Sequence, residues 1–418
     1  MPSTAPAKNP FVYGRVLTAS DAACPRPALE ERVRQAIRDN GRLALVGDRR
    51  MGKSSLVQRT LQAARVPMLR LNYHEVLDLP DVVMRTVADL ERFLRERSPV
   101  ARRLVPWLRE TGVELRGIRA GMAGLEIKAS LGLQADHLKR AFGYIRDAAS
   151  RAPMALFIDE LQDLRDCLPP AVGNAALAIL RDEIQQMAKT PVFFAGSARD
   201  SFALLFTADR SPLYEHAPLL AVEPIPPEVL RDFILTQFAR DKGIDPGAAA
   251  LIPAIAGESP NDVQLLGYET WIEHLAGSGP ASSMTVQHAL AKVLRDLTPY
   301  AEKWMSDLTV KQRRLVFAVA FLEHVGAATG EFMVFAGIRH PGDVERALAT
   351  ALRGDQALLE KVGSRYRFRS RFVRLWFALQ YYRVQALIPA MRAPEVYRRH
   401  LRTALPALPA DPLKDILP

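Results

Sequence analysis

The stretch of sequence that decides the fold reads Gly47-Asp48-Arg49-Arg50-Met51-Gly52-Lys53-Ser54-Ser55. It matches the pattern G-x-x-x-x-G-K-[ST] at every fixed position. Glycines let a backbone wrap around phosphate oxygens and direct its N–H groups at them. The Lys53 ammonium can neutralise phosphate charge, the Ser54 hydroxyl can bind Mg²⁺, and a following helix adds the positive end of its dipole. We therefore predict that residues 47–55 bind the phosphates of a nucleotide.

The segments around this loop predict strands that alternate with helices. An apolar run at residues 42–46 precedes the loop, and a helix pattern follows it to about Ala64. Helix patterns separate further apolar runs at residues 66–71, 154–158, 192–195 and 219–222. This alternation indicates a parallel sheet with helices on its faces. The predicted fold class is an α/β, parallel-sheet P-loop nucleotide-binding domain.

Two acids, Asp159 and Glu160, directly follow the apolar run at residues 154–158. The carboxyl ends of parallel strands form the edge at which α/β sheets bind ligands. We expect Asp159 to share Mg²⁺ with Ser54 and Glu160 to activate the attacking water as a general base. A pair of acids is also an ordinary solvated strand end. The phosphate-binding loop in the same chain favours the catalytic interpretation.

Ser197 follows the next apolar run, at residues 192–195. A hydroxyl beside the Asp159 strand can sense a γ-phosphate or position water, and it can equally be an ordinary helix cap. Both interpretations stay open. Arg199 likewise either reaches a phosphate or pairs with Asp200.

Composition limits the classes of protein that fit. The 418 residues include 56 Lys+Arg and 46 Asp+Glu, a formal net charge of +10, and the length suggests about two to four domains. The basic balance permits a nucleic acid or another polyanion as partner, although genomic base composition also produces arginine-rich chains. We predict no membrane span, no secretory leader, no disulfide scaffold and no zinc site. A reducing, cytoplasmic setting is expected.

The order of the patterns divides the chain into four segments. They are an α/β nucleotide domain, a helical lid, a winged-helix module and a basic, then proline-rich tail, at residues 1–223, 224–307, 308–392 and 393–418. The first segment contains an insertion at residues 98–140. Residues 113–119 and 125–131 both alternate apolar and polar side chains, so a β-hairpin is predicted inside the insertion.

The segment at residues 308–392 predicts three helices followed by a hairpin. Two strand-like runs, 358–362 and 365–369, flank the turn signal Gly363-Ser364. Basic and apolar side chains alternate on the second run, so one face of that strand is basic. Candidate contacts with the phosphate backbone of DNA are Lys361, Arg365, Arg367 and Arg369. The third helix opens with Asp343 and Glu345, so a protein-binding or packing role stays open.

The ordered set of motifs resembles the archaeal-type ATPases, a branch of the P-loop NTPases near the AAA+ and STAND families. The similarity covers about residues 9 to 385. The phosphate loop resembles their Walker A motif. The other matching segments are Asn9-Pro10-Phe11-Val12-Tyr13-Gly14, Pro25-Arg26, Phe157-Ile158-Asp159-Glu160-Leu161-Gln162, Gly196-Ser197, Ser211-Pro212-Leu213-Tyr214 and Gly257-Glu258-Ser259-Pro260.

This resemblance implies ATP and Mg²⁺ as ligands. It implies that Tyr13, Arg26 and Pro260 contact the nucleotide, that Ser197 is a sensor, and that ATP binds between the α/β domain and the lid. Two departures from the family pattern concern its arginines. Glu215-His216 stands where the family often has Gly-Arg, which leaves Arg210 as the candidate arginine finger, and Asn261 lies where many AAA+ proteins have an arginine.

Three classes of function compete. The first is a slowly hydrolysing, nucleotide-controlled switch that associates with nucleic acid in replication, a mobile element or genome defence, as the basic wing suggests. The second is a signalling or scaffold ATPase whose winged helix binds a protein partner, or which self-associates, with partner-dependent hydrolysis. The third, a small-molecule kinase, is disfavoured because the chain has no recognisable acceptor-site motif.

Overall fold

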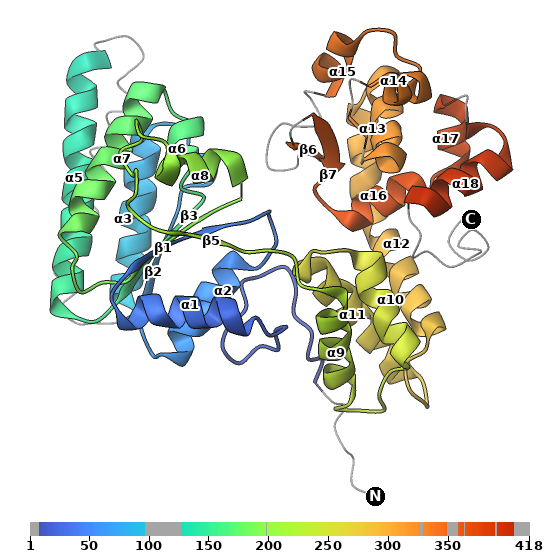
Figure 1. Ribbon diagram of the computed structural model, residues 1–418, viewed down its shortest axis with the longest axis horizontal. Coiled ribbons are helices and arrows are strands. Elements are labelled where there is room, and N and C mark those ends of the chain that lie inside the picture. Colours follow the sequence, from blue (N-terminus) through green and yellow to red (C-terminus); the bar gives the residue numbers. More distant parts are fainter. Residues whose placement is uncertain are drawn as a thin grey trace, which may run out of the picture. The chain divides into compact units, whose positions relative to one another are not determined.

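Two units divide the chain in its computed structural model (Figure 1). The α/β unit comprises Val16–Asp21 and Pro25–Pro224, and the helical unit comprises Met1–Arg15, Ala22–Cys24 and Ile225–Pro418. Residues 8–15 therefore group with the helical unit, whereas the sequence analysis places them in the α/β domain. The structure describes residues 8–96, 127–197, 199–323, 325–326, 329–348, 358–362, 364–388 and 391–404.

A five-stranded parallel sheet forms the centre of the α/β unit, with strand order β2-β3-β4-β1-β5. Its strands are β1 (Arg42–Val46), β2 (Met68–Asn72), β3 (Ala155–Asp159), β4 (Val192–Gly196) and β5 (Leu219–Ala221). Every residue of β3 and β4 is buried, which explains their unbroken apolar runs. The predicted α/β fold is confirmed, and the register places Asp159 beside Ala195 at the carboxyl edge.

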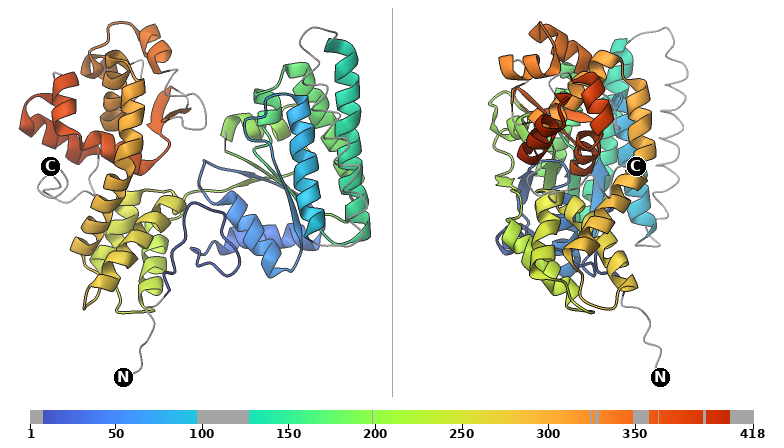
Figure 2. Two further views of the ribbon diagram at one scale, coloured as in Figure 1. Left: turned by 180° about the vertical axis from the view of Figure 1, so that it is seen from behind. Right: turned by 90° about the vertical axis from the view of Figure 1, so that its right-hand side faces the viewer.

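Helices cover both faces of this sheet, as Figures 1 and 2 show, and an apolar core lies on each face. Side chains alternate between the faces along each strand, so Phe193 enters one core and Phe194 the other. One core contains α1 (Pro27–Arg38) and α2 (Lys53–Ala63). The other contains α3 (Leu79–Arg95), α5 (Ile127–Arg151), α6 (Asp163–Asp166), α7 (Pro170–Gln185) and α8 (Arg199–Thr207).

The hairpin predicted inside the insertion is wrong in its second strand. Residues 127–131 lie in the helix α5, whereas residues 113–119 lie outside the described residues. Leu138, Phe142 and Ile145 of α5 are buried at helical spacing. A helix extends more easily than it nucleates. The packed part of α5 therefore allows the helix to include residues 127–131, although the apolar residues of that stretch alternate as in a strand.

Four helices build the first part of the helical unit. They are α9 (Pro227–Phe238), α10 (Pro246–Ala256), α11 (Pro260–Ala276) and α12 (Ser283–Asp307). A proline begins each of the first three helices, where the missing N–H costs no hydrogen bond. The side chains of Ser259 and Ser282 cap α11 and α12, so the loop chemistry sets where these helices start.

An N-terminal arm, residues 8–15, packs on α11. The Asn9 side chain donates to the carbonyl of Tyr268 (3.1 Å), and the amide of Val12 donates to Gln264 Oε1 (3.0 Å). The Phe11 ring is 1% exposed. A Cβ at Gly267 would lie 2.7 Å from that ring, so the glycine makes room for it. The arm is thus part of the core of the helical unit.

Three helices and an antiparallel hairpin follow α12, in the predicted order. These elements are α13 (Val310–Leu322), α14 (Gly330–Ala336), α15 (Pro341–Leu348), β6 (Leu359–Val362) and β7 (Arg365–Phe368). Thr309 and Gln312 form a capping box at the start of α13. Phe317 of α13 packs against Phe377, which lies in the helix α16 (Arg371–Ala378) beyond the hairpin.

The module does not end at residue 392. Two more helices follow α16, namely α17 (Tyr381–Leu387) and α18 (Pro394–Ala404). Tyr397, Leu401 and Ala404 are buried, so much of the segment predicted as a tail is a packed helix. Among the described residues, none of the helices combines the length and the apolar character that crossing a membrane requires.

Candidate nucleotide-binding site

The loop that follows β1 has a backbone that its glycines make possible. A Cβ at Gly47 would lie 2.6 Å from the carbonyl oxygen of Val222, so only glycine fits there without a shift. Gly52 has φ +84°, and Arg50 has φ +67° in the same left-handed region. The loop therefore reverses direction between β1 and α2 with left-handed residues of the kind that phosphate-binding loops use.

The Lys53 side chain folds back across this loop. Its Nζ donates to the carbonyl oxygens of Gly47 (2.6 Å) and Asp48 (3.0 Å), and the residue is 6% exposed. A buried ammonium group requires such acceptors. The positive charge is thereby fixed within the loop that would hold the phosphates.

Ser54 and Asp159, which the sequence pairs as magnesium ligands, lie in direct contact. Ser54 Oγ donates to Asp159 Oδ2 at 2.9 Å. A hydroxyl and a carboxylate are oxygen donors of the kind that Mg²⁺ takes beside phosphate oxygens, so the residues fit the ion. Arg70 Nη2 also lies 2.5 Å from Asp159 Oδ2. We did not predict this arginine from the sequence, because it lies in the middle of β2.

Glu160 is held by three hydrogen bonds. Its Oε2 accepts from the backbone N–H of Ser197 (3.1 Å), from Ser197 Oγ (2.9 Å) and from Gln162 Nε2 (2.8 Å). Burial opposes ionisation, but the bonds from Gln162 and Ser197 and the charge of Lys53 outweigh it, so the pKa of Glu160 is lowered. The carboxylate is therefore ionised at neutral pH, and the Ser197 hydroxyl orients it.

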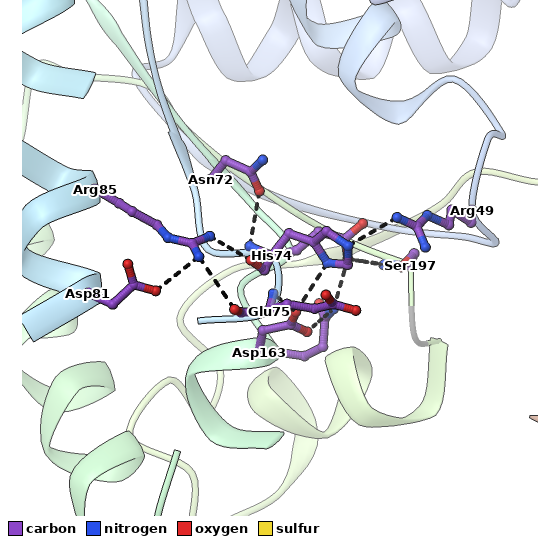
Figure 3. A network of polar contacts seen from close by, with 10 residues as sticks. Arg49, Asn72, His74, Glu75, Asp81, Arg85, Asp163 and Ser197 are labelled. Atoms are coloured by element: carbon purple, nitrogen blue, oxygen red, sulfur yellow. Dashed lines mark hydrogen bonds and ion pairs between the residues drawn. The ribbon is translucent and has the colours of Figure 1, made fainter. Parts of the chain in front are cut away.

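A chain of polar contacts links Glu160 to the phosphate loop (Figure 3). Gln162 Nε2 also donates to Asp163 Oδ1 (2.8 Å), and Asp163 Oδ2 lies 3.4 Å from His74 Nδ1. On its other side, His74 Nε2 lies 3.1 Å from Arg49 Nη2. A guanidinium only donates, so Nε2 of the neutral ring accepts and Nδ1 carries the proton.

The pKa of His74 is raised by its hydrogen bond to Asp163, against the opposing effects of burial and of Arg49. Arg85 fixes the loop that carries this histidine, because its Nη1 donates to the His74 carbonyl at 2.6 Å. Sequence reasoning missed His74 and Asp163, and it placed Gln162 in the acidic motif without assigning it a contact. The one feature of the sequence that could have indicated these residues is their position, because each follows the carboxyl end of a strand of the same sheet.

The remaining predicted nucleotide contacts fall in both units. Tyr13 lies in the N-terminal arm, is 39% exposed and has its ring 5.2 Å from that of Tyr268. Pro260 is the first residue of α11. Arg26 belongs to the α/β unit, where its Nη1 donates to the carbonyl of Glu223 at 3.1 Å. Contact of these three residues with a nucleotide stays a prediction.

The segment after α8 carries Glu215 and His216, at the two positions where the archaeal-type ATPases often have Gly-Arg. Glu215 adopts φ +52°, the left-handed conformation that favours the family's glycine. His216 turns toward Arg42, with Nδ1 3.4 Å from Arg42 Nη1. Burial, and then the charges of Arg42 and Arg181, lower the pKa of His216 to about 4. The ring is neutral at pH 7, so it cannot supply the positive charge of an arginine finger. Arg210, the candidate finger, is exposed.

The predicted basic hairpin is partly neutralised. Lys361 Nζ lies 2.7 Å from Glu345 Oε1, and Arg367 is ion-paired with Glu360. Arg365 is exposed, and Arg369 is partly buried. The nearby Arg374 is a core residue, because its Nη1 lies 2.5 Å from Glu323 and its Nε donates to the Ala320 carbonyl at 2.9 Å.

No family model and no curated protein matches this chain. Among solved structures, it is similar to a Walker-type ATPase of Pyrococcus abyssi, with 14% identity over 85% of this chain and 96% of that one and a TM-score of 0.54. The Aeropyrum pernix Orc1 protein, solved in complex with DNA, is 14% identical over 88% and 96%, with a TM-score of 0.48. The Thermotoga maritima RuvB branch migration motor is 12% identical over 82% and 92%, with a TM-score of 0.41.

At 14% sequence identity, the similarity to the Pyrococcus abyssi protein is evidence about the fold alone. Together with the five-stranded parallel sheet and the loop between β1 and α2, the first of these structures establishes that the α/β unit has the P-loop NTPase fold.

Proposed function

We propose that this chain is a nucleotide-controlled switch that binds ATP with Mg²⁺ and hydrolyses it slowly. One observation carries the proposal. The Lys53 ammonium, the Ser54–Asp159 contact and the Ser197–Glu160 contact all lie at the carboxyl edge of the parallel sheet. That edge is where sheets of this type bind ligands.

Each of these residues has a role in the proposed reaction. Lys53 neutralises β- and γ-phosphate charge once it exchanges its carbonyl partners for phosphate oxygens. Ser54 and Asp159 would hold Mg²⁺, which when bound supplies positive charge to the phosphate oxygens. Glu160, ionised and oriented by Ser197, accepts a proton from the attacking water. Ser197 thereby connects the general base to the phosphate end of the nucleotide.

Slow hydrolysis is supported by two features of the site. Arg70 occupies the carboxylate oxygen that Ser54 also contacts, so binding of the metal must compete with an ion pair. The position at which the family has an arginine carries the neutral His216. Because an arginine finger accelerates some NTPases by about 10³–10⁵-fold, turnover would depend on Arg210 or on a partner.

ATP binding and turnover of the purified protein, alone and with duplex DNA, test this proposal. Lys53→Ala should lose ATP affinity. Glu160→Gln should keep the affinity and lose turnover by about 10²-fold or more, because it lacks the general base. Unchanged turnover in Glu160→Gln would exclude this glutamate as the base. Wild-type affinity in Lys53→Ala would exclude the phosphate loop as the nucleotide site.

We infer further that the C-terminal module is a winged helix that contacts DNA through Lys361, Arg365, Arg367 and Arg369. The order of three helices and an antiparallel hairpin supports this inference, as does the exposure of Arg365. Arg365→Glu/Arg367→Glu should weaken DNA binding and reduce its salt dependence. Equal binding by this variant would exclude the hairpin as the contact.

A protein partner is the second candidate for this module. Asp343 and Glu345 at the start of α15 pair with Lys311 (2.9 Å) and Lys361 (2.7 Å). A helix that opens with acids is unfavourable for phosphate contacts and suits a basic protein surface or a second copy of the chain. Nucleotide-dependent oligomerisation in sedimentation experiments, without affinity for DNA, would favour this alternative.

A further inference from the structure

We propose that the helix α18 is a second surface of the C-terminal module that binds the phosphate backbone of nucleic acid, separate from the hairpin. This inference rests on the proposed association with nucleic acid. It starts from the sequence of α18, in which Arg398, Arg399 and Arg402 are all exposed. Arg392, just before the helix, is exposed as well.

The helix is a fixed element on which these arginines are held in place. Tyr397 is fully buried, and its hydroxyl donates to the carbonyl of Ala378 at 2.7 Å. Its ring packs on Phe321, and the ring of His400 lies 5.4 Å from that of Phe335. An anchored helix loses little backbone freedom when a ligand binds to its arginines, which favours affinity.

Glu395 is the sole acid between residues 391 and 404. Within the described part of the chain, Arg392, Arg398, Arg399 and Arg402 have no ion pair. Some exposed arginines elsewhere are paired, such as Arg231, which lies 2.8 Å from Asp232. Arg398 and Arg402 are like charges one turn apart, which destabilises a helix by about 0.2–0.5 kcal/mol. Arg402 also lies in the last turn of α18, where the helix dipole favours a cation. Without acidic partners, the cluster as a whole fits an anionic ligand.

The chemistry of the outward side favours nucleic acid over a lipid surface. The exposed residues of α18 are charged or small, without the large apolar side chains that an interfacial helix inserts into lipid. An exposed aromatic ring belongs to the same region. Tyr382, at 74% exposure, packs on Tyr381, whose ring lies 4.8 Å from that of Tyr397. Arginines together with an exposed aromatic ring are the groups that contact phosphates and stack on bases.

This surface is distinct from the hairpin. In Figures 1 and 2, β6 and β7 lie on one side of α13, whereas α17 and α18 lie on another side. Changes to α18 therefore leave the hairpin and its ion pairs intact. The two surfaces can be tested independently in one protein.

The test measures binding of a short labelled duplex DNA to the full chain by fluorescence anisotropy, at several salt concentrations. Arg398→Glu/Arg402→Glu should remove two phosphate contacts and so reduce the slope of log affinity against log salt by about 2. A fourfold rise in salt would then weaken binding about 10-fold less than in the wild type. Arg231→Glu/Arg240→Glu, with the same change in net charge on exposed residues of the same unit, should leave the slope unchanged.

Each outcome decides the proposal. Wild-type affinity and slope in the α18 variant would overturn it, even if the hairpin variant loses binding. If the charge reversal unfolds the protein by circular dichroism, Arg398→Gln/Arg402→Gln gives the same decision. A wild-type protein that does not bind duplex or single-stranded DNA at low salt would also overturn it. In that case, ATP affinity in the wild type and in Lys53→Ala still tests the nucleotide switch separately.

Discussion

The neutral ring of His216 makes the stability of the α/β unit sensitive to acid. Burial and the neighbouring charges of Arg42 and Arg181 lower its pKa to about 4, whereas the unfolded chain has an ordinary histidine pKa near 6.5. A lowered histidine pKa stabilises the folded state fully above pH 6.5. That stabilisation is lost as the pH falls from about 6.5 toward about 4, because only the unfolded state takes up the proton.

The magnitude follows from the two pKa values. Between pH 7 and pH 5, the full shift of His216 corresponds to a loss of about 2 kcal/mol in the free energy of unfolding. The ring is only partly buried, so solvent screening reduces the expected loss to about 1 kcal/mol. His216→Gln removes the titrating group and keeps a polar side chain beside Arg42. The variant should therefore lose about 1 kcal/mol less than the wild type between these pH values.

Hydrogen exchange followed by mass spectrometry measures this difference in one unit at a time. Peptides from β1 and β4 report on the α/β unit, and a difference of about 1 kcal/mol is about fivefold in the opening equilibrium. Peptides from α11 are the internal control, because they belong to the helical unit. If His216→Gln keeps the whole pH response of the wild type in β1 and β4, the reasoning is refuted.

Three further predictions concern the loop, the proposed general base Glu160 and the helical core. Gly47→Ala places a Cβ 2.6 Å from the Val222 carbonyl, so urea denaturation should show a loss of about 1–3 kcal/mol in the α/β unit; an unchanged midpoint would mean that the loop moves freely. Ser197→Ala removes one hydrogen bond to Glu160, so steady-state assays should show ATP turnover about 10-fold slower with ATP affinity retained; equal loss of affinity would instead assign the serine to nucleotide binding. Arg374→Gln breaks a buried ion pair, so tryptophan fluorescence in urea should show the helical unit destabilised by about 3–5 kcal/mol, and a change below about 1 kcal/mol would contradict that burial.

Local sequence patterns predicted the sheet, and they predicted that the loop at residues 47–55 and the two acids lie at its carboxyl edge. The five apolar runs coincide with β1–β5 to within two residues, because buried parallel strands are continuously apolar. The motif at residues 47–55 and the acids Asp159 and Glu160 could be assigned to one edge, since parallel strands end on the same side of the sheet.

Contacts between distant segments could not be predicted in this way. His74 and Asp163 meet across the sheet edge, and nothing in either local sequence indicates the other. The contact of Arg70 with Asp159 was not predicted, because a basic residue in a strand normally points to solvent. The helix α18 was not predicted, because arginines dominate the composition of this segment. They obscure the helical spacing of its buried residues Tyr397, Leu401 and Ala404.

The position of the N-terminal arm determines when its native contacts can form during synthesis of the chain. Asn9 bonds to Tyr268, a partner 259 residues later in the chain. At about 5–20 residues per second, the ribosome needs about 13 to 50 s to synthesise that interval. Phe11 is fully buried against Trp271 in the folded protein. During that interval, Phe11 has been synthesised but the residues against which it packs have not. The arm is thus synthesised long before its native contacts exist, and the helical unit completes its core only after the α/β unit has been made.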